Sequence, residues 1–502
     1  MSGSSYRTIL RSSSIIGGAQ AVNVVINIAK IKILALLLGP LGVGLIGLYA
    51  SIVQTGSTIA GLGLGTVGTR QVAAANGNQD AAALMLARKA LFWGTLGLSL
   101  AGAAGVWLGS TRIAVAVFGD EARADEVAWL ALGVGLTVAS GSQVALLTGL
   151  RQLGNLALLQ VGAGFVGALL GILAIWQWGE PAILAMVLVA PAASFALGHL
   201  FVARLAKPAA GATGWRELAV EIRAMVALGL AVMISALATV AGQLVVRVIV
   251  QQQLGGAALG FFQAAWAISM TYLGFILVAM GTDFFPRLSA AMETPEQAAR
   301  LVNEQTEIGL LLCGPVLIAM LGLSPWVIAV LYSPEFAPAV DVLRWQLLGD
   351  MLKVMSWPLG FVLLAVGAGK TFALAETVGV AVFVAGTAAG LSVFGLAATG
   401  IAFLLMYVVY LPLVFWLANR RMRIRWSRAV VMQGGAVLGA AVLVDVASRQ
   451  SAVLGGVLGV MLAAVFGCWA LYRIALMAEL GGKLAILARL GRKLRAWTTS
   501  RP

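Results

Sequence analysis

Apolar stretches of membrane-crossing length recur along this chain, separated by short polar breaks. An α-helix needs about 20 mainly apolar residues to cross the hydrocarbon core of a bilayer. The pattern therefore predicts an all-α polytopic membrane protein with about 14 transmembrane helices. The predicted spans are Ser13–Leu38, Leu45–Gly68, Ala90–Gly109, Val127–Gly149, Leu156–Trp176, Ala182–Val202, Met225–Val250, Ala258–Phe284, Glu307–Leu323, Val342–Val366, Phe372–Phe394, Ala397–Leu417, Ala429–Val446 and Ala452–Tyr472.

The first of these stretches carries a polar stripe. Gln20, Asn23, Asn27 and Lys30 follow one another at the steps i, i+3, i+7 and i+10, which keeps them on a narrow face of a helix. A lysine at the centre of a lipid-facing helix costs at least ~2.5–3.5 kcal/mol. We therefore expect the stripe to face protein or water, as part of a pathway for a negatively charged substrate. Lys32 lies on another face, and we expect it to snorkel to the membrane surface.

Composition supports the membrane interpretation, and the charge pattern sets the orientation. Of the 502 residues 61% are hydrophobic and 10% charged, whereas soluble proteins carry about 25% charged residues. The net charge of +14 comes mainly from breaks that alternate along the chain, such as the basic run at 420–428, while Asp120 and Glu121 lie in a break of the other set. Basic residues favour the cytoplasmic side. We expect both termini in the cytoplasm and no nucleic-acid partner.

A weak internal repeat defines the expected architecture. A shift of 216 residues places Gly39 on Gly255 and Gly44 on Gly260. The two copies begin an even number of helices apart, so they are parallel repeats of six helices each around a central cavity, followed by two C-terminal helices. The expected parts are an N-terminal lobe (1–203, helices 1–6), a cytoplasmic linker (204–223), a C-terminal lobe (224–418, helices 7–12), helices 13 and 14 (419–474) and a basic amphipathic cytoplasmic tail (475–502) that binds anionic membrane lipids.

Three segments resemble a known family. They are the sequence LGPLGVGLIG at 38–47, Thr69-Arg70-Gln71 at the end of the second span, and VLYSPEFAPA at 330–339. They are similar to the polysaccharide transporters that include the Wzx O-antigen flippases, within the multidrug/oligosaccharidyl-lipid/polysaccharide exporter superfamily. The resemblance implies a bacterial inner-membrane protein that moves undecaprenyl-pyrophosphate-linked oligosaccharides. It further implies partners such as a glycan polymerase and glycosyltransferases, and we expect a monomer.

The seventh helix supplies the second half of the expected substrate site. The 216-residue shift places Asn23 on Thr239 and Asn27 on Gln243, and Arg247 lies one residue from the image of Lys30. We expect Lys30 and Arg247 to approach from the two lobes and bind the pyrophosphate, with the neutral groups binding sugar hydroxyls. In the alternative interpretation, the neutral groups only hydrogen-bond between helices and the two cations snorkel outward.

Ion coupling has its own candidates. Gln346, Asp350 and Lys353 share one face of the tenth helix. Asp350 and Lys353, at i and i+3, form either a self-neutralising pair or a proton or cation site whose occupancy releases Lys353. Asp283, near Arg287, is a further coupling candidate, with an interfacial ion pair as the alternative. The single histidine, His199, predicts no metal site.

Nothing in the sequence predicts catalysis or a cofactor. There is no P-loop, and the glycine-rich segment 61–68 lies inside an apolar span, where tight helix packing explains it better than a dinucleotide site. We expect a flippase that works by alternating access and is not an enzyme. The alternatives are a cation-coupled multidrug exporter of the same superfamily and a non-transporting membrane scaffold for glycosyltransferases.

Overall fold

The computed structural model of this protein describes residues 3–205 and 214–477, and every regular element in those two ranges is a helix. Most of the expected tail, and residues 206–213 of the expected linker, lie outside the described residues. The elements are α1 (Gly3–Gly61), α2 (Leu64–Gly77), α3 (Ala81–Leu108), α4 (Ser110–Phe118), η1 (Glu121–Arg123), α5 (Ala124–Gly149), α6 (Leu153–Trp178), η2 (Glu180–Ala182), α7 (Ile183–Ala203), α8 (Trp215–Ala290), α9 (Pro295–Leu331), η3 (Pro334–Phe336), α10 (Ala339–Ala365), α11 (Gly369–Phe394), α12 (Ala397–Met422), α13 (Arg428–Gln450) and α14 (Ala452–Met477).

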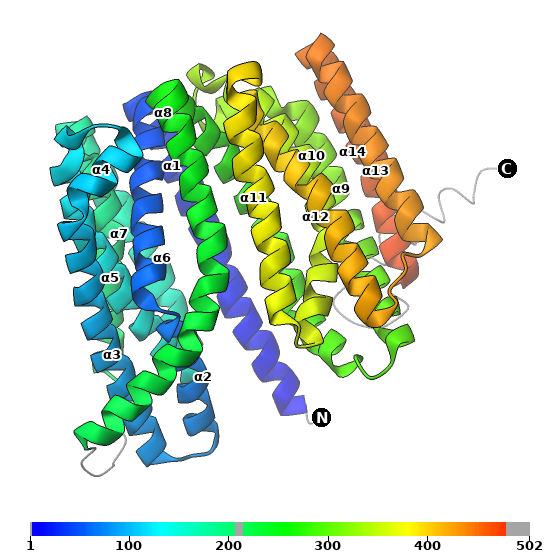
Figure 1. Ribbon diagram of the computed structural model, residues 1–502. Helices are drawn as coiled ribbons and strands as arrows, with labels where there is room; N and C mark the ends of the chain where they lie inside the picture. The colour runs from blue at the N-terminus through cyan, green and yellow to red at the C-terminus, as the bar shows by residue number, and fades with distance from the viewer. Residues whose placement is uncertain (1–2, 206–213, 478–502) are drawn as a thin grey trace. The chain divides into compact units, whose positions relative to one another are not determined.

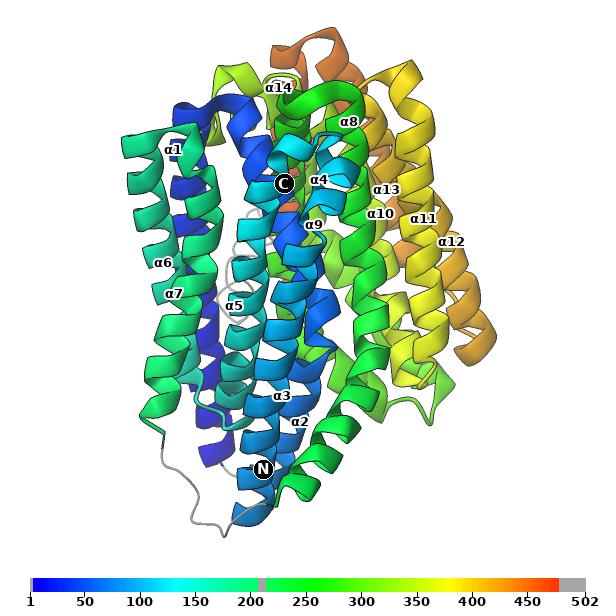
Figure 2. The same ribbon diagram turned by 60° about the vertical axis from the view of Figure 1, so that its left-hand side comes forward.

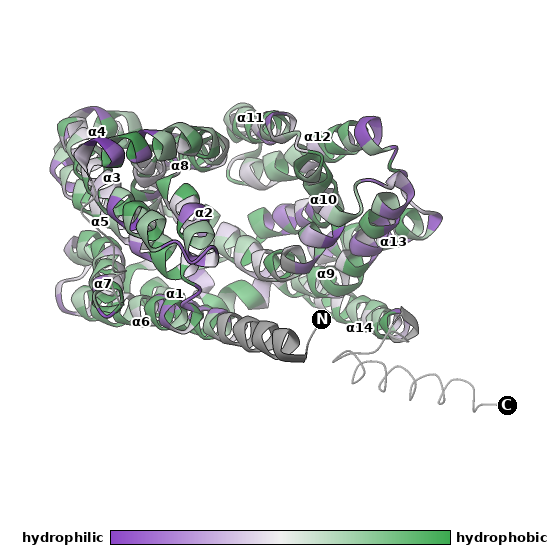
Figure 3. Cartoon of the chain, turned by 90° about the horizontal axis from the view of Figure 1, so that it is seen from below, coloured by the Kyte–Doolittle hydropathy of each residue, from purple (hydrophilic) through white to green (hydrophobic). Residues whose placement is uncertain are grey.

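The predicted all-α polytopic fold is confirmed. Within the described ranges, 12 segments have the length and hydropathy of a membrane span. Two of these segments, Gly17–Gly61 and Ala236–Val278, contain a non-helical glycine, Gly39 and Gly255 respectively. Each of the two therefore holds two of the predicted spans, which is consistent with about 14 crossings. In Figure 3 most of the helical ribbon is coloured as hydrophobic, and hydrophilic residues occur mainly toward helix ends and connections.

The second predicted span, Leu45–Gly68, is wrong in one respect, because it is not continuous. Leu62 and Gly63 have positive φ angles of 44° and 68°, which end α1 and start α2. Hydropathy reports burial in lipid and carries no information about whether the backbone stays helical, so the break was invisible in the apolar pattern. The short helix α4, between α3 and α5, was also not predicted.

The parallel repeat is visible in the backbone. Helices α5, α6 and α7 of the first copy correspond to α10, α11 and α12 of the second at nearly constant offset. Positive φ angles, which only a few positions in the described chain adopt, recur at three places in both copies. The pairs separated by 216 residues are Gly39 and Gly255, Arg151 and Gly367, and Gly179 and Gly395.

Two glycines allow α1 and α8 to cross in backbone contact. A Cβ atom on Gly260 would lie 1.8 Å from the carbonyl oxygen of Pro40, and one on Gly44 would lie 2.6 Å from that of Gly256. The 216-residue shift turns the first of these contacts into the second, so the crossing is reciprocal, as in a twofold-symmetric interface. In lipid, where burial of apolar surface drives little association, such close packing of small residues holds helices together.

The described chain forms two compact units. Unit 1 contains Met1–Gln263 and Leu331–Glu335, and unit 2 contains Ala264–Val330 and Phe336–Pro502. In unit 1, α6 packs beside α7 and α3 beside α5 (Figure 1, Figure 2). The first half of α8 belongs to this unit, since Leu218 and Met225 are buried in one hydrophobic cluster with α2, α3 and α5. The division into an N-terminal lobe (1–203) and a C-terminal lobe (224–418) comes from the sequence repeat alone and stays a prediction.

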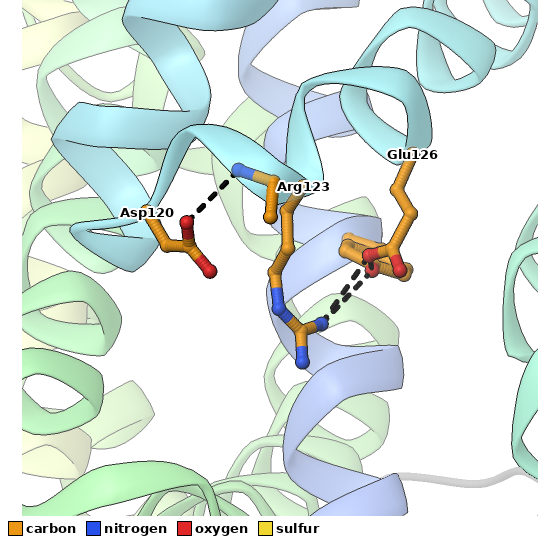
Figure 4. A network of polar contacts seen from close by, with 5 residues as sticks. Asp120, Arg123 and Glu126 are labelled. Carbon is orange, nitrogen blue, oxygen red and sulfur yellow. Dashed lines mark hydrogen bonds and ion pairs between the residues drawn. The ribbon is translucent and has the colours of Figure 1, made fainter.

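A polar network fixes the turn between α4 and α5 against α1 (Figure 4). The Asp120 carboxylate accepts a hydrogen bond from the backbone at the start of η1, and the guanidinium of Arg123 lies 3.2 Å from the Glu126 carboxylate. Tyr49 of α1 donates its hydroxyl hydrogen to Glu126 and packs its ring against Phe118. The acidic connection between the third and fourth predicted spans is therefore fixed to α1 by side-chain contacts within unit 1.

The glycine crossing yields a stability prediction. We expect Gly260→Ala to lower the thermal unfolding temperature of the detergent-purified protein, because the added methyl group would overlap the Pro40 carbonyl oxygen and overpacking costs about 1–3 kcal/mol. The control is Gly97→Ala in α3, where a Cβ would meet no atom within 4 Å, and which should leave the temperature unchanged or slightly higher. Equal unfolding temperatures for the two variants would contradict the proposed role of the crossing.

Candidate substrate and coupling sites

The polar stripe of α1 is present in the structure, but its members have different surroundings. Gln20 and Asn27 are exposed, and Lys30 is partly exposed. Lys30 has no hydrogen-bond or ion-pair partner among the described residues, so its ammonium group is available to an anion. Asn23 instead packs against α6, because its side-chain oxygen would lie 2.8 Å from a Cβ atom on Gly164.

Lys32, on the other face of α1, makes a specific contact that the sequence did not predict. Its ammonium group donates a hydrogen bond to the backbone carbonyl of Tyr332. Tyr332 lies in the segment 331–335, which begins at the last residue of α9 and belongs to unit 1. The Tyr332 side chain is buried, and burial raises the pKa of its hydroxyl above the ordinary value. Glu335 of the same segment lies beside the kink at Gly39. The part of the motif at 331–335 therefore packs on α1.

The Arg247 side chain is buried and has several specific contacts. Only 5% of its surface is exposed. Its Nε donates to the side-chain oxygen of Gln263 at 3.0 Å, and one of its terminal nitrogens donates to the backbone oxygen of Gln243 at 3.1 Å. The guanidinium also lies over the ring of Phe262, 5.8 Å from its centroid. Thr239, two turns earlier in the helix, is half-buried.

Gln263, which binds Arg247, also packs at the crossing of α1 and α8. A Cβ atom on Gly47 would lie 2.6 Å from the side-chain amide carbon of Gln263, so this glutamine packs on the bare backbone of α1. The 216-residue shift places Gln263 on Gly47, a signal that could have identified Gln263 from sequence. Lys30 and Arg247 both belong to unit 1, and no described hydrogen bond or ion pair joins them, so their joint role in binding stays a prediction.

A buried polar cluster in unit 2 surrounds Asp350. Asp350 is fully buried, and one of its carboxylate oxygens accepts a 2.6 Å hydrogen bond from the Ser269 hydroxyl. The other oxygen, and both polar atoms of the buried Gln346 side chain, have no hydrogen-bond partner within the described ranges. The ammonium nitrogen of Lys353 lies 3.4 Å from the Met270 sulfur. The i, i+3 pair is thus not in direct contact.

Glu376 joins this cluster, although sequence reasoning did not select it. Its carboxylate accepts a hydrogen bond from the Tyr410 hydroxyl. Lys353 interacts electrostatically with both Asp350 and Glu376. The three ionisable groups lie inside apolar helices, which makes them candidates for a proton or cation site. The available signal was an acidic residue within an apolar span.

Asp283 has a different environment from Asp350. Its carboxylate lies 3.1 Å from the guanidinium of Arg287, and the two side chains are 74% and 57% exposed respectively. Exposed i, i+4 pairs of this kind contribute little to stability. This geometry is that of the interfacial ion pair that was the alternative for Asp283, whose coupling role stays a prediction.

The helices and sites together define a polytopic α-helical membrane protein built from two parallel repeats, with polar and charged groups inside its helix bundles. The family model described as "Polysaccharide biosynthesis protein" matches residues 33–341, more than half of the chain. The chain belongs to this polysaccharide biosynthesis family.

Individual relatives agree with this family. The lipid III flippases of Escherichia coli (strain K12) and Shigella flexneri are each 25% identical to the chain over 401 residues, which cover 78% of this chain and 94% of either flippase.

Two solved structures of membrane transporters have the same fold. The lipid II flippase MurJ, in an inward closed conformation, aligns with a TM-score of 0.69 at 12% identity over 92% of this chain and 99% of its own. An inward-facing MATE multidrug transporter of the MOP superfamily aligns with a TM-score of 0.69 at 16% identity, covering 80% and 94%. The expected fold and the expected polysaccharide family are confirmed.

The fixed position of Arg247 leads to a second stability prediction. Arg247→Lys keeps the charge but loses the fork that reaches Gln263 and the Gln243 carbonyl. We expect a lower thermal unfolding temperature in detergent, equivalent to about 1–3 kcal/mol for the buried groups left unpaired. Arg112→Lys, at an exposed arginine of α4, is the control. Unfolding of both variants at the wild-type temperature would refute the restraint.

Proposed function

We propose that this protein is a flippase that moves undecaprenyl-pyrophosphate-linked oligosaccharide, an O-antigen or exopolysaccharide repeat unit, from the cytoplasmic to the periplasmic leaflet. The observation that carries the proposal is Lys30, a cation in a membrane-length helix with no partner among the described residues. A polysaccharide biosynthesis protein of this fold needs such a group for an anionic lipid carrier. The lipid III flippases and MurJ support the same class of cargo.

The proposed anion site combines two kinds of cation. Lys30 offers a compact, strongly hydrated charge, which binds a phosphate without imposing one orientation. Arg247 is pre-oriented by Gln263 and the Gln243 backbone, which reduces the entropy lost when a ligand binds. Gln20, Asn27 and Thr239 are proposed to bind sugar hydroxyls. Binding must be moderate, since an anion held too tightly would not be released.

The cycle that we propose is alternating access in the bacterial inner membrane, with both termini in the cytoplasm. The glycan and pyrophosphate pass through the protein while the lipid chain stays in the bilayer. Glycosyltransferases on the cytoplasmic side supply the cargo, and a glycan polymerase on the periplasmic side consumes it. The protein acts as a monomer.

The Asp350 cluster is proposed to couple this cycle to a proton or a monovalent cation. Neutralising Asp350 removes one of the two carboxylates whose charge acts on Lys353 and leaves that of Glu376. Because charges in a medium of low dielectric interact strongly, this change alters the relative energies of different helix arrangements in unit 2. A ligand that binds one arrangement better shifts the population toward it.

The two alternatives make different demands on the site. A multidrug exporter for cationic compounds needs acidic side chains where the substrate binds, whereas the α1 stripe presents Lys30. A non-transporting scaffold needs no charge at this position. Substitution of the cations separates these alternatives from the flippase.

The first functional prediction concerns the cations. Lys30→Ala combined with Arg247→Ala should abolish surface glycan at normal expression, because the pyrophosphate loses both partners. Exchange of the two residues should restore part of the export. The measurement is surface glycan detected by gel or antibody, with exposed Lys370→Ala as control. Normal glycan from the double alanine variant would exclude the proposed anion site.

The second functional prediction concerns coupling. Asp350→Asn keeps an acceptor for Ser269 but removes the titratable charge. In proteoliposomes, flipping of lipid-linked glycan should lose its response to an imposed proton or sodium gradient, with a coupling effect on the order of tenfold. Glu304→Gln, at an exposed ion pair with Arg300, is the control, and Asp283→Asn tests the remaining candidate. A gradient response in Asp350→Asn equal to wild type would rule out coupling at Asp350.

A further inference from the structure

The break between α1 and α2 belongs to the first repeat alone. Leu62 and Gly63 leave the helix, with Gly63 packed closely against the backbone of Gly229. At the 216-residue offset the second copy has Val278 and Ala279, which continue as helix inside α8. The fold can therefore be built without this break. Irregular backbone at membrane depth occurs where it lines a cavity or is buried in protein.

A cavity of about 240 Å³ lies at the break, entirely within unit 1. Its walls come from α1, α2, α3, α5 and α8, and the described lining residues include no charged side chain. The polar side chains that line it are largely hydroxyl-bearing: Gln54, Ser57, Thr58, Thr66, Thr95, Thr137 and Ser142. The cavity is much larger than a bare ion and is of the size of a single sugar ring.

Thr95 differs from the other buried hydroxyl residue of this lining in its hydrogen bonding. It is 4% exposed, and its hydroxyl oxygen has no hydrogen-bond partner within the described ranges. A buried hydroxyl without a partner costs free energy. Thr95 lines the cavity, so a polar ligand there would supply the missing hydrogen bond.

The other hydroxyls give the cavity a defined polarity. Thr58 donates to the Gln54 carbonyl at 2.7 Å, Thr137 to that of Gly133 at 2.7 Å, and Ser142 to that of Ala139 at 2.8 Å. Their hydrogens are thus occupied by helix carbonyls, and their oxygens keep lone pairs that can accept. An uncharged, largely apolar lining that offers several hydroxyl acceptors suits a neutral ligand with O–H donors and an apolar face.

The second repeat lacks these groups. The offsets of its helices place Ser57 on Leu273, Thr95 on Gly309 and Ser142 on Trp357. Neither the break nor the hydroxyls are requirements of the repeated fold. This asymmetry is expected of a ligand site in the first copy.

We infer that this cavity, the broken-helix pocket, binds one sugar ring of the lipid-linked oligosaccharide, with Thr95 hydrogen-bonding a sugar hydroxyl. The inference rests on the proposed function and extends it, because it assigns glycan recognition to residues separate from the cations that hold the pyrophosphate. Specificity for a polar substituent arises when a buried protein group would otherwise stay unpaired.

The test compares lipids with and without a sugar. The protein in nanodiscs is titrated with undecaprenyl pyrophosphate and with the same lipid carrying N-acetylglucosamine or galactose. We expect wild type to bind a glycosylated lipid several-fold more tightly than the bare lipid. Thr95→Val, which keeps the shape and removes the hydroxyl, should weaken the glycosylated lipid about two- to tenfold, the effect of one lost hydrogen bond, and leave the bare lipid unchanged. Ser142→Ala should act in the same direction.

Thr55→Val is the matched control. Thr55 is also buried with a partnerless hydroxyl among the described residues, but it is not part of the cavity lining. Equal binding of bare and glycosylated lipids by wild type, or equal effects of Thr95→Val and Thr55→Val, would overturn the sugar pocket while leaving the flippase proposal intact. A changed sodium dependence of bare-lipid binding in Thr95→Val would identify a cation site and overturn it too. If wild type binds none of the three lipids, the proposed function falls with it.

Discussion

The contact between the bare backbones of α1 and α8 is the constraint on which unit 1 depends. At Gly44 and Gly260 no side chain separates the helices, and lipid provides little hydrophobic force to hold them by other means. The kinks at Gly39 and Gly255 lie just before these contacts in their respective copies. The 216-residue repeat relates the two halves of this crossing. One motif of small residues, present in both copies, therefore forms a self-complementary contact between the helices.

The crossing also positions the charged groups around it. Gln263 packs on Gly47 and at the same time accepts from Arg247, so the guanidinium is oriented by the joint itself. Lys32 fastens the segment 331–335 to α1 beyond the kink. Lys30, on another face of the same helix, is left without a partner among the described residues. One helix therefore carries a structural lysine and a lysine suited to a ligand, two residues apart.

The two repeats have diverged in chemistry while keeping their backbone. In the first copy the broken helix borders a cavity lined in part by hydroxyls. In the second copy the corresponding helix is continuous, and the buried polar cluster contains Asp350, Lys353 and Glu376. Hydroxyls can remain uncharged at low cost in a membrane, whereas buried carboxylates are expensive and respond to protons and cations. The proposed recognition of a neutral glycan and the proposed coupling therefore lie in different repeats.

The amino-acid sequence alone determined the class of fold, its approximate number of spans and the parallel repeat, because hydropathy must follow the thickness of the bilayer and duplicated glycines keep their spacing. It also identified Lys30, Arg247 and Asp350, since charges inside apolar spans are conspicuous. It did not reveal the break at Leu62–Gly63, the hydroxyl of Thr95, the partner of Lys32 or the link from Lys353 to Glu376. Those features depend on which faces of distant helices meet, and a serine or threonine in an apolar span has no distinctive pattern. Only the tertiary structure decided which of these polar groups found hydrogen-bond partners, because a partner depends on which distant helices pack together.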